Sequence, residues 1–327
     1  MTHGPTPHGP TRRRDATWLV ALGAALWGSD ALLRVPLVGS YPASTIVFLE
    51  HVVIVLVTLP WLLPALRAFA GASARTKAAV LVIGAGASAL ATVLFTQAFV
   101  HAPATSAAIT PVVLQKLQPV IAVLVAYWLL KERITLRYPL FLVPALVGAW
   151  LLAFPDPTSV SVAAGLSAAL AVGAAALWAT GTVLGRMVGA EIGLRDLTIL
   201  RFAIGLPASL VLVLLLGDPL TASTRDLPVV ALLGLIPGLL AIALYYRGLR
   251  STPASRATLA ELAFPLTAAV VGVAFLDNVL SGTQWLGAAV VAASVTALAL
   301  HERFSSRKAV ATPAPVEEAV PVPADQA

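Results

Sequence analysis

Ten long apolar segments, separated by short polar stretches, make up most of this sequence. They cover residues 16–36, 43–64, 77–99, 104–130, 136–154, 162–185, 196–216, 227–249, 255–276 and 282–301. A helix needs about 20 mostly apolar residues to cross the hydrocarbon core of a bilayer, and each segment comes close to that length. Only 11% of the residues are charged, against about 25% in soluble domains. The sequence therefore predicts an all-α integral membrane protein with ten transmembrane helices.

The positive charges predict how these helices are oriented. With a cytoplasmic N-terminus, 17 of the 21 Lys and Arg residues fall in cytoplasmic segments. Arg34 and Arg225 fall outside, and Lys116 and Arg201 fall within spans. Because Lys and Arg concentrate in cytoplasmic loops, both termini are expected on the cytoplasmic side of a bacterial cytoplasmic membrane. The same charges explain the net charge of +6 better than nucleic-acid binding, for which no basic and aromatic cluster appears.

The two ends of the chain have a different composition from the apolar segments. Residues 1–15 are basic, and residues 303–327 are rich in Pro, Ala and Glu; both lack the apolar surface needed for folding and are predicted to be disordered tails. The basic start followed by an apolar run also fits a signal peptide, but no clear small-residue cleavage site follows, which favours a retained first helix. The chain has no cysteine, which excludes disulfides and Cys-ligated metals, and no cofactor is expected.

The two halves of the chain resemble each other, which predicts a five-helix repeat over residues 16–154 and another over 160–302. LWGSDALLR (26–34) aligns with LWATGTVLG (177–185), and QPVIAVLVAYWLLKE (118–132) aligns with FPLTAAVVGVAFLDN (264–278). Because five is odd, the second copy must lie upside down relative to the first. Inverted repeats of this kind are common in carriers, whose substrate site lies near the midplane at the repeat interface.

These features together resemble the EamA-type members of the drug/metabolite transporter superfamily. The similarity lies in the paired first spans with LW motifs, in Pro119 followed by Glu132, and in Gly148 and Gly287 of the last spans. The second copy has Asp277 where the family usually has Glu. The resemblance implies transport of a small molecule, since members move amino acids, drugs, sugars and other metabolites.

Five ionisable side chains lie inside the predicted spans, where each costs about 2.5–3.5 kcal/mol on insertion scales and normally faces a cavity or a partner. They are Asp30, Glu50, Lys116, Arg201 and Glu261. Under the repeat alignment Glu50 matches Arg201, which predicts two ion pairs with exchanged charges: Glu50 with Lys116, and Arg201 with Glu261. The alternative is that each pair only holds helices together.

Further polar and aromatic residues at mid-span extend this candidate substrate site. Gln115 and Gln118 lie one turn apart beside Lys116, and are predicted to orient an anionic group that the lysine binds. Trp27 and Trp178 match across the repeats and are either cavity walls or packing wedges.

Two more ionisable residues are ambiguous. Arg34 is four residues from Asp30, so the two can pair on one helical face, although Arg34 lies near the outer end of its span and is expected to snorkel to the interface. His51 could relay protons, but a hydrogen bond to a neighbouring helix is the favoured reading.

The sequence thus favours a secondary-active or facilitative carrier that works by alternating access and exports a small polar or amphipathic metabolite. An amino-acid-like or other carboxylate-bearing substrate is favoured, with Asp30 or Glu50 as candidate carriers of a coupling proton. The expected partners are this small molecule and the lipid bilayer, and the protein is expected to be a monomer or homodimer. The rivals are a scaffold or sensor subunit and, less favoured, a membrane enzyme, for which no HExxH, GxSxG or Walker motif is present.

Overall fold

The computed structural model describes residues 16–101, 114–115, 117–132, 138–154, 156–158, 165–275 and 279–311, and all of its regular elements are helical. The first half contains α1 (Thr17–Gly28), α2 (Asp30–Val38), α3 (Ala43–Gly71), α4 (Ala74–Leu81), η1 (Val82–Leu90), α5 (Ala91–Val100), α7 (Gln118–Leu130) and α8 (Pro139–Ala153). The second half contains α9 (Leu166–Val188), α10 (Leu194–Leu216), α11 (Leu227–Leu233), η2 (Gly234–Leu240), α12 (Ala241–Leu249), α13 (Ala254–Ala260), α14 (Ala263–Phe275) and α15 (Gly282–Ala311).

Each predicted apolar segment coincides, over its described residues, with one helix or with consecutive helices. Among the described residues, six helical stretches are long and apolar enough to cross a membrane. They are Ala43–Gly71, Ala74–Ala98, Leu166–Val188, Leu194–Leu216, Leu227–Leu249 and Arg256–Phe275. The all-α membrane fold is therefore confirmed, while the count of ten spans stays a prediction.

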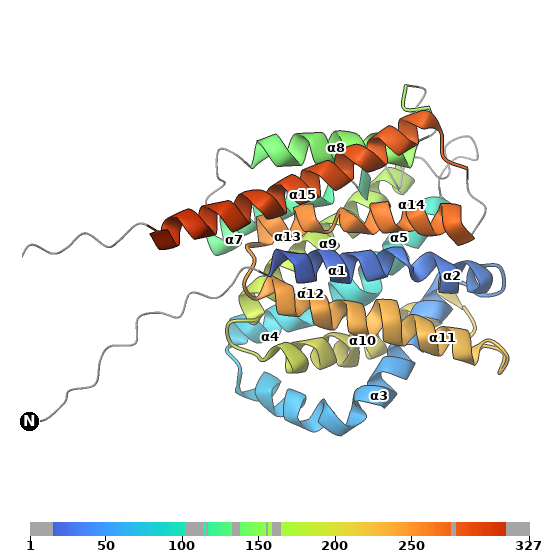
Figure 1. Cartoon of the computed structure of the whole chain (residues 1–327). Helices are drawn as coiled ribbons and strands as arrows, with labels where there is room; N and C mark the ends of the chain where they lie inside the picture. Colours follow the sequence, from blue (N-terminus) through green and yellow to red (C-terminus); the bar gives the residue numbers. More distant parts are fainter. Residues whose placement is uncertain are drawn as a thin grey trace, which may run out of the picture.

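The helices lie roughly side by side, with their axes along one common direction (Figure 1). Helices α8 and α15 pack along each other on one side of the molecule, and α3 packs along α10 toward the other side. Between these pairs, α1 packs on α12 and α14, while α9 packs on α5 and α7. Helices α1 and α9 therefore lie between the two outlying pairs.

Two glycines allow α8 and α15 to approach closely. A Cβ atom on Gly148 would lie 2.9 Å from the Gly287 carbonyl oxygen, and one on Gly287 would lie 2.4 Å from the Leu152 nitrogen. Both distances are too short for a side chain, so only glycine fits at these two positions. The contact follows the general rule that small residues at membrane helix interfaces let backbones touch.

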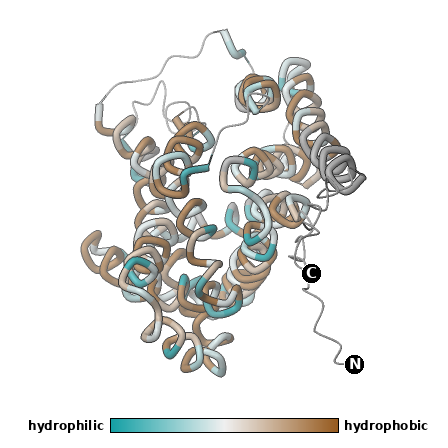
Figure 2. The backbone as a smooth tube through the Cα atoms, turned by 90° about the vertical axis from the view of Figure 1, so that its left-hand side faces the viewer, coloured by the Kyte–Doolittle hydropathy of each residue, from teal (hydrophilic) through white to brown (hydrophobic). Residues whose placement is uncertain are grey.

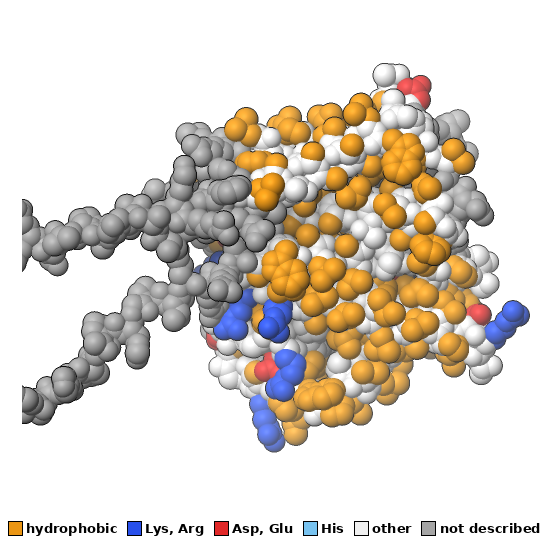
Figure 3. Space-filling view, viewed as in Figure 1, with side chains coloured by type: hydrophobic (Ala, Val, Ile, Leu, Met, Phe, Trp, Pro, Cys, Tyr) orange, Lys and Arg blue, Asp and Glu red, His pale blue; other side chains and the backbone are white. Residues whose placement is uncertain are grey.

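The outer surface suits a bilayer. Apolar side chains cover the broad middle of the face seen in Figure 3, while the Lys and Arg side chains visible there lie toward the two ends. Viewed along the helices, much of the outward-facing tube is also apolar (Figure 2). Trp128 is 78% exposed and Leu215 is 76% exposed, which water would penalise and hydrocarbon favours.

Two stretches of wider π-helix, η1 and η2, interrupt otherwise α-helical spans. The η1 segment joins α4 to α5, and η2 joins α11 to α12. In η2, Pro237 has no N–H with which to continue the α-helical pattern. Such segments occur frequently at functional sites, and η1 packs directly on α9 and α10.

Candidate functional site

A break between α13 and α14 places a carboxylate inside the helix bundle. Helix α13 ends at Ala260 and α14 begins at Ala263. Pro265 cannot donate to the Glu261 carbonyl because proline has no N–H; the Phe264 N–H donates to that carbonyl instead, at 2.9 Å. The proline, visible in the sequence, therefore accounts for the tighter turn that presents Glu261.

The Glu261 carboxylate joins four helical elements from both halves of the chain. The Gln118 amide, at the start of α7, donates to Oε2 at 2.7 Å. The Thr182 hydroxyl on α9 and the Tyr245 hydroxyl on α12 donate to Oε1 at 3.0 and 2.7 Å. The two hydroxyl oxygens are 2.8 Å apart. This arrangement brings Gln118 and Glu261 together, a contact that the sequence analysis did not predict, and it adds the Thr182 and Tyr245 hydroxyls to the site.

Two aromatic pairs join α12 and α9, which carry Tyr245 and Thr182 of this network, to helices of the first half. Trp27 on α1 lies against Tyr245, with ring centroids 5.1 Å apart and the planes tilted by 42°. Phe95 on α5 meets Trp178 on α9 edge-on at 5.2 Å. Both tryptophans are only partly buried and each pairs with a ring of the opposite half. These contacts fit cavity walls and packing wedges alike, so the choice between the two predicted roles stays open.

Arg201 does not pair with Glu261, which corrects the predicted ion pair. The Arg201 guanidinium donates from Nη1 to the Tyr246 hydroxyl at 3.1 Å and from Nη2 to the Ala87 carbonyl in η1 at 3.4 Å, while Nε is buried and has no partner within the described part of the chain. The consecutive tyrosines of α12 separate the two charges, because Tyr245 bonds to Glu261 and Tyr246 bonds to Arg201. Two adjacent tyrosines in an apolar run were the available sequence signal.

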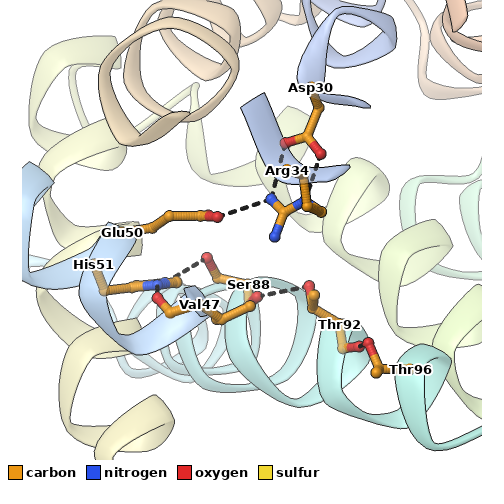
Figure 4. Close-up of polar contacts among 8 residues, drawn as sticks. All are labelled: Asp30, Arg34, Val47, Glu50, His51, Ser88, Thr92 and Thr96. Carbon is orange, nitrogen blue, oxygen red and sulfur yellow. Dashed lines mark hydrogen bonds and ion pairs between the residues drawn. The ribbon is translucent and has the colours of Figure 1, made fainter. Parts of the chain in front are cut away.

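A second polar cluster joins α2 to α3 (Figure 4). The Arg34 guanidinium lies between two carboxylates: it hydrogen-bonds to Asp30, with Nη2 2.8 Å from Oδ1, and forms an ion pair with Glu50 at 2.8 Å. The predicted Asp30–Arg34 pair is therefore confirmed. The expectation that Arg34 snorkels away is wrong, because a second carboxylate on α3 holds it inward.

His51 bonds to a neighbouring helix, as favoured from the sequence. Its ring nitrogens lie 2.7 Å from the Val47 carbonyl and 3.0 Å from the Ser88 hydroxyl of η1. Ser88 begins a row that continues one turn at a time through Thr92 and Thr96, whose hydroxyls donate to carbonyls of the preceding turn (Figure 4). With both ring nitrogens engaged and only 3% of the residue exposed, His51 supports packing rather than a proton relay.

The remaining predicted residues are Lys116 and Gln115. Lys116 lies outside the described residues, so its predicted pairing with Glu50 is untested, although the ion-pair partner that the structure gives to Glu50 is Arg34. Gln115 is described and partly buried. The structure thus brings predicted residues together in two groups, Glu261 with Gln118, and Arg34 with Asp30 and Glu50.

Comparison with known proteins agrees with this architecture. The EamA-like transporter family model matches the chain twice, over residues 16–154 and 165–300. The riboflavin transporter ImpX of Fusobacterium nucleatum is 29% identical over 295 residues, covering 85% of this chain and 95% of the relative. The uncharacterized transporter YwfM of Bacillus subtilis is 33% identical over 174 residues, covering 53% of this chain and 58% of the relative.

A solved crystal structure supports the fold. It aligns with a TM-score of 0.69 at 19% sequence identity, covering 89% of this chain and 99% of that chain. Family match, named relatives, apolar surface and spanning helices all agree. The chain therefore belongs to the EamA-like transporter family of the drug/metabolite transporter superfamily and is a multi-pass membrane transporter.

Proposed function

We propose that this transporter is a ten-span carrier that exports a small zwitterionic, amino-acid-like metabolite by alternating access across the bacterial cytoplasmic membrane. The observation that carries the proposal is a pair of buried opposite charges that do not neutralise each other. Among the described residues, Arg201 bonds to a hydroxyl and a carbonyl, Glu261 bonds to an amide and two hydroxyls, and neither forms an ion pair. A buried charge without a counter-charge is costly. This favours a ligand that supplies an anionic group for Arg201 and a cationic group for Glu261.

The substrate charges would match these two groups. The buried Nε of Arg201 has no partner among the residues that the structure describes and can donate to a substrate carboxylate, since a guanidinium binds carboxylates through several N–H groups. Glu261 can accept from a substrate ammonium group. Lys116 and Gln115, which flank the start of α7 in sequence, are proposed to contact the anionic part of the substrate, and Gln118 would then exchange its bond to Glu261 for one to the substrate.

The inverted-repeat architecture is supported by the packing. In the two repeats α1 corresponds to α9, α5 to α12, and α7 to α14. The contacts of α1 with α12 and α14 therefore have counterparts in the contacts of α9 with α5 and α7. The pairs α3–α10 and α8–α15 each join a helix to its own counterpart. The π-helical segments at 82–90 and 234–240 also correspond, at nearly the spacing of the sequence repeat. We therefore assign residues 16–154 and 160–302 to two inverted five-span units, with both termini in the cytoplasm.

A second substrate class is favoured by a separate observation. ImpX, which is similar over nearly its whole length, is named as a riboflavin transporter. Aromatic pairs at Trp27–Tyr245 and Phe95–Trp178 could stack against a planar heterocycle. A flavin-like compound is therefore the alternative, and it would depend on the aromatic side chains rather than on the two charges.

Ligand-dependent thermal stabilisation of the purified protein tests these proposals, because a ligand of the folded state stabilises it by mass action. Zwitterionic amino acids, the corresponding amines, the corresponding carboxylic acids and riboflavin are compared. Stabilisation by the zwitterions alone, abolished by Arg201→Met and by Glu261→Gln, is expected. The matched control is Gln284→Leu, since Gln284 bonds to the Leu152 carbonyl between α8 and α15 and its loss should leave the ligand response intact.

The other outcomes are equally informative. If riboflavin stabilises the protein, and this effect is lost in Trp27→Ala and Trp178→Ala but kept in Arg201→Met, the substrate is a flavin-like compound and not a zwitterion. Uptake or counterflow of the stabilising compound in proteoliposomes separates a carrier from a sensor subunit. Binding without any flux would overturn transport of that compound.

A further inference from the structure

The partners of Glu261 differ in kind from those of the other interior carboxylates that the structure describes. The amide of Gln118 can donate through its NH2 group or, after turning over, accept through its oxygen. The Thr182 and Tyr245 hydroxyls can remain donors to Oε1 whether or not Oε2 carries a proton. Glu261 can therefore change its protonation state and keep all three partners, provided that one amide turns.

Asp30, Glu50 and Glu132 have partners that can only donate. Asp30 and Glu50 share the Arg34 guanidinium, which has no acceptor, so protonating either one sacrifices a charge-assisted contact. Glu132 accepts from the Ala254 backbone N–H at 3.2 Å, and a backbone N–H likewise cannot accept. The hydrogen-bond partners therefore favour Glu261 as a proton carrier over Asp30 and Glu50, which the sequence suggested.

We propose that Glu261 is the proton-binding group of this carrier, an inference that rests on the proposed transport function. A proton adds to Oε2, and the Gln118 amide turns to accept from the new O–H; on release the proton returns to water and the amide turns back. The exchange links the start of α7 with the break between α13 and α14, so both halves of the chain sense it. A proton also neutralises the carboxylate that an ammonium group would bind, so proton and substrate occupy Glu261 in turn.

The charged groups around Glu261 are compatible with this role. None of the Lys or Arg residues that the structure describes forms an ion pair with it. The ionisable groups on the surrounding elements include Tyr245, Tyr246 and Arg247 on α12, Tyr138 at the start of α8, Arg186 on α9, Arg256 on α13, the Asp30–Arg34 pair of α2, Tyr127 on α7, Lys131 and Glu132 at its end, and Lys116, which lies outside the described residues. Arg186 is engaged by the Leu249 and Arg250 carbonyls.

The contact between Trp27 and Tyr245 provides a reporter that needs no substrate. Tyr245 touches Trp27 and bonds to Glu261, so a proton on Glu261 changes the surroundings of the indole ring. The full chain in lipid nanodiscs is titrated from about pH 4 to about pH 9, a range that includes both the ordinary pKa of a carboxyl group and strongly raised values. The difference between the emission of the wild type and that of Trp27→Phe gives the signal of Trp27 without those of the other tryptophans.

The expected result is one transition in the Trp27 emission, absent in Glu261→Gln and retained in the matched acid-to-amide control Glu50→Gln and in Lys116→Gln. If Glu261→Gln does not fold, Gln118→Leu and Tyr245→Phe keep the test decisive, because each must displace the midpoint. A transition that persists in Glu261→Gln, a wild-type protein without a transition, or a midpoint unchanged in both partner variants would overturn the proposal. The titration requires no transported compound, so its outcome does not depend on the metabolite screen. The two proposals can therefore fail separately.

Discussion

Arg34 is the residue whose removal should most clearly reveal the energetics of its cluster with Asp30 and Glu50. One guanidinium serves two carboxylates, so Arg34→Met leaves Asp30 and Glu50 facing each other without a cation. Removing one member of a buried ion pair typically costs about 3–5 kcal/mol. The side chains of Arg34, Asp30 and Glu50 are 27%, 25% and 13% exposed; partial access to water places the expected loss near the lower limit, at about 3 kcal/mol.

The charge balance makes a sharper prediction for combined variants. Glu50→Gln removes the excess negative charge and leaves Arg34 paired with Asp30, so it should cost only about 1 kcal/mol. In the double variant Arg34→Met/Glu50→Gln a single carboxylate remains unpaired, so it should be about 1–2 kcal/mol more stable than Arg34→Met alone. Equilibrium unfolding in mixed detergent micelles measures all three free energies. Strictly additive losses, or an Arg34→Met protein as stable as the wild type, would refute this account of the cluster.

Three further predictions concern other parts of the chain. Hydrogen bonds from the Thr76 hydroxyl and the Ser73 N–H and hydroxyl lower the pKa of the exposed Glu191 carboxyl; its stabilising effect is therefore present above the ordinary Glu pKa and is lost as pH falls through the lowered value. Glu191→Gln should reduce thermal stability at neutral pH but not in acid, and an equal deficit at both would contradict this. Gly287→Ala should cost about 1–3 kcal/mol in micelle unfolding, because its Cβ would lie 2.4 Å from the Leu152 nitrogen, and an unchanged stability would show that α8 and α15 separate freely. Since the chain has no cysteine, one introduced after residue 311 should react with an impermeant maleimide in inside-out vesicles only; labelling of intact spheroplasts would reverse the orientation.

The fold class could be predicted from the sequence because the length of each apolar segment and the asymmetry of charge between its flanks are local, additive properties. A run of apolar residues must leave water wherever its neighbours lie, and a proline breaks a helix at its own position, as Pro265 does beside Glu261. Close contact of Gly148 with Gly287 was likewise signalled by small residues in the last predicted span of each repeat. The Asp30–Arg34 pair was accessible for the same reason, since four residues make one helical turn.

Pairings between distant helices were decided by tertiary structure. Complementary charge, from which the Arg201–Glu261 pair was predicted, does not establish that two side chains meet. Tyr245 and Tyr246 stand between them, and Gln118 from the other half takes the place expected of the arginine. Rotation of each helix about its own axis determines such contacts, and that rotation depends on the packing of every neighbour at once. The sequence alone thus predicted a membrane transporter with charged residues inside its spans, whereas the partners of these charges emerged only when all the helices were packed together.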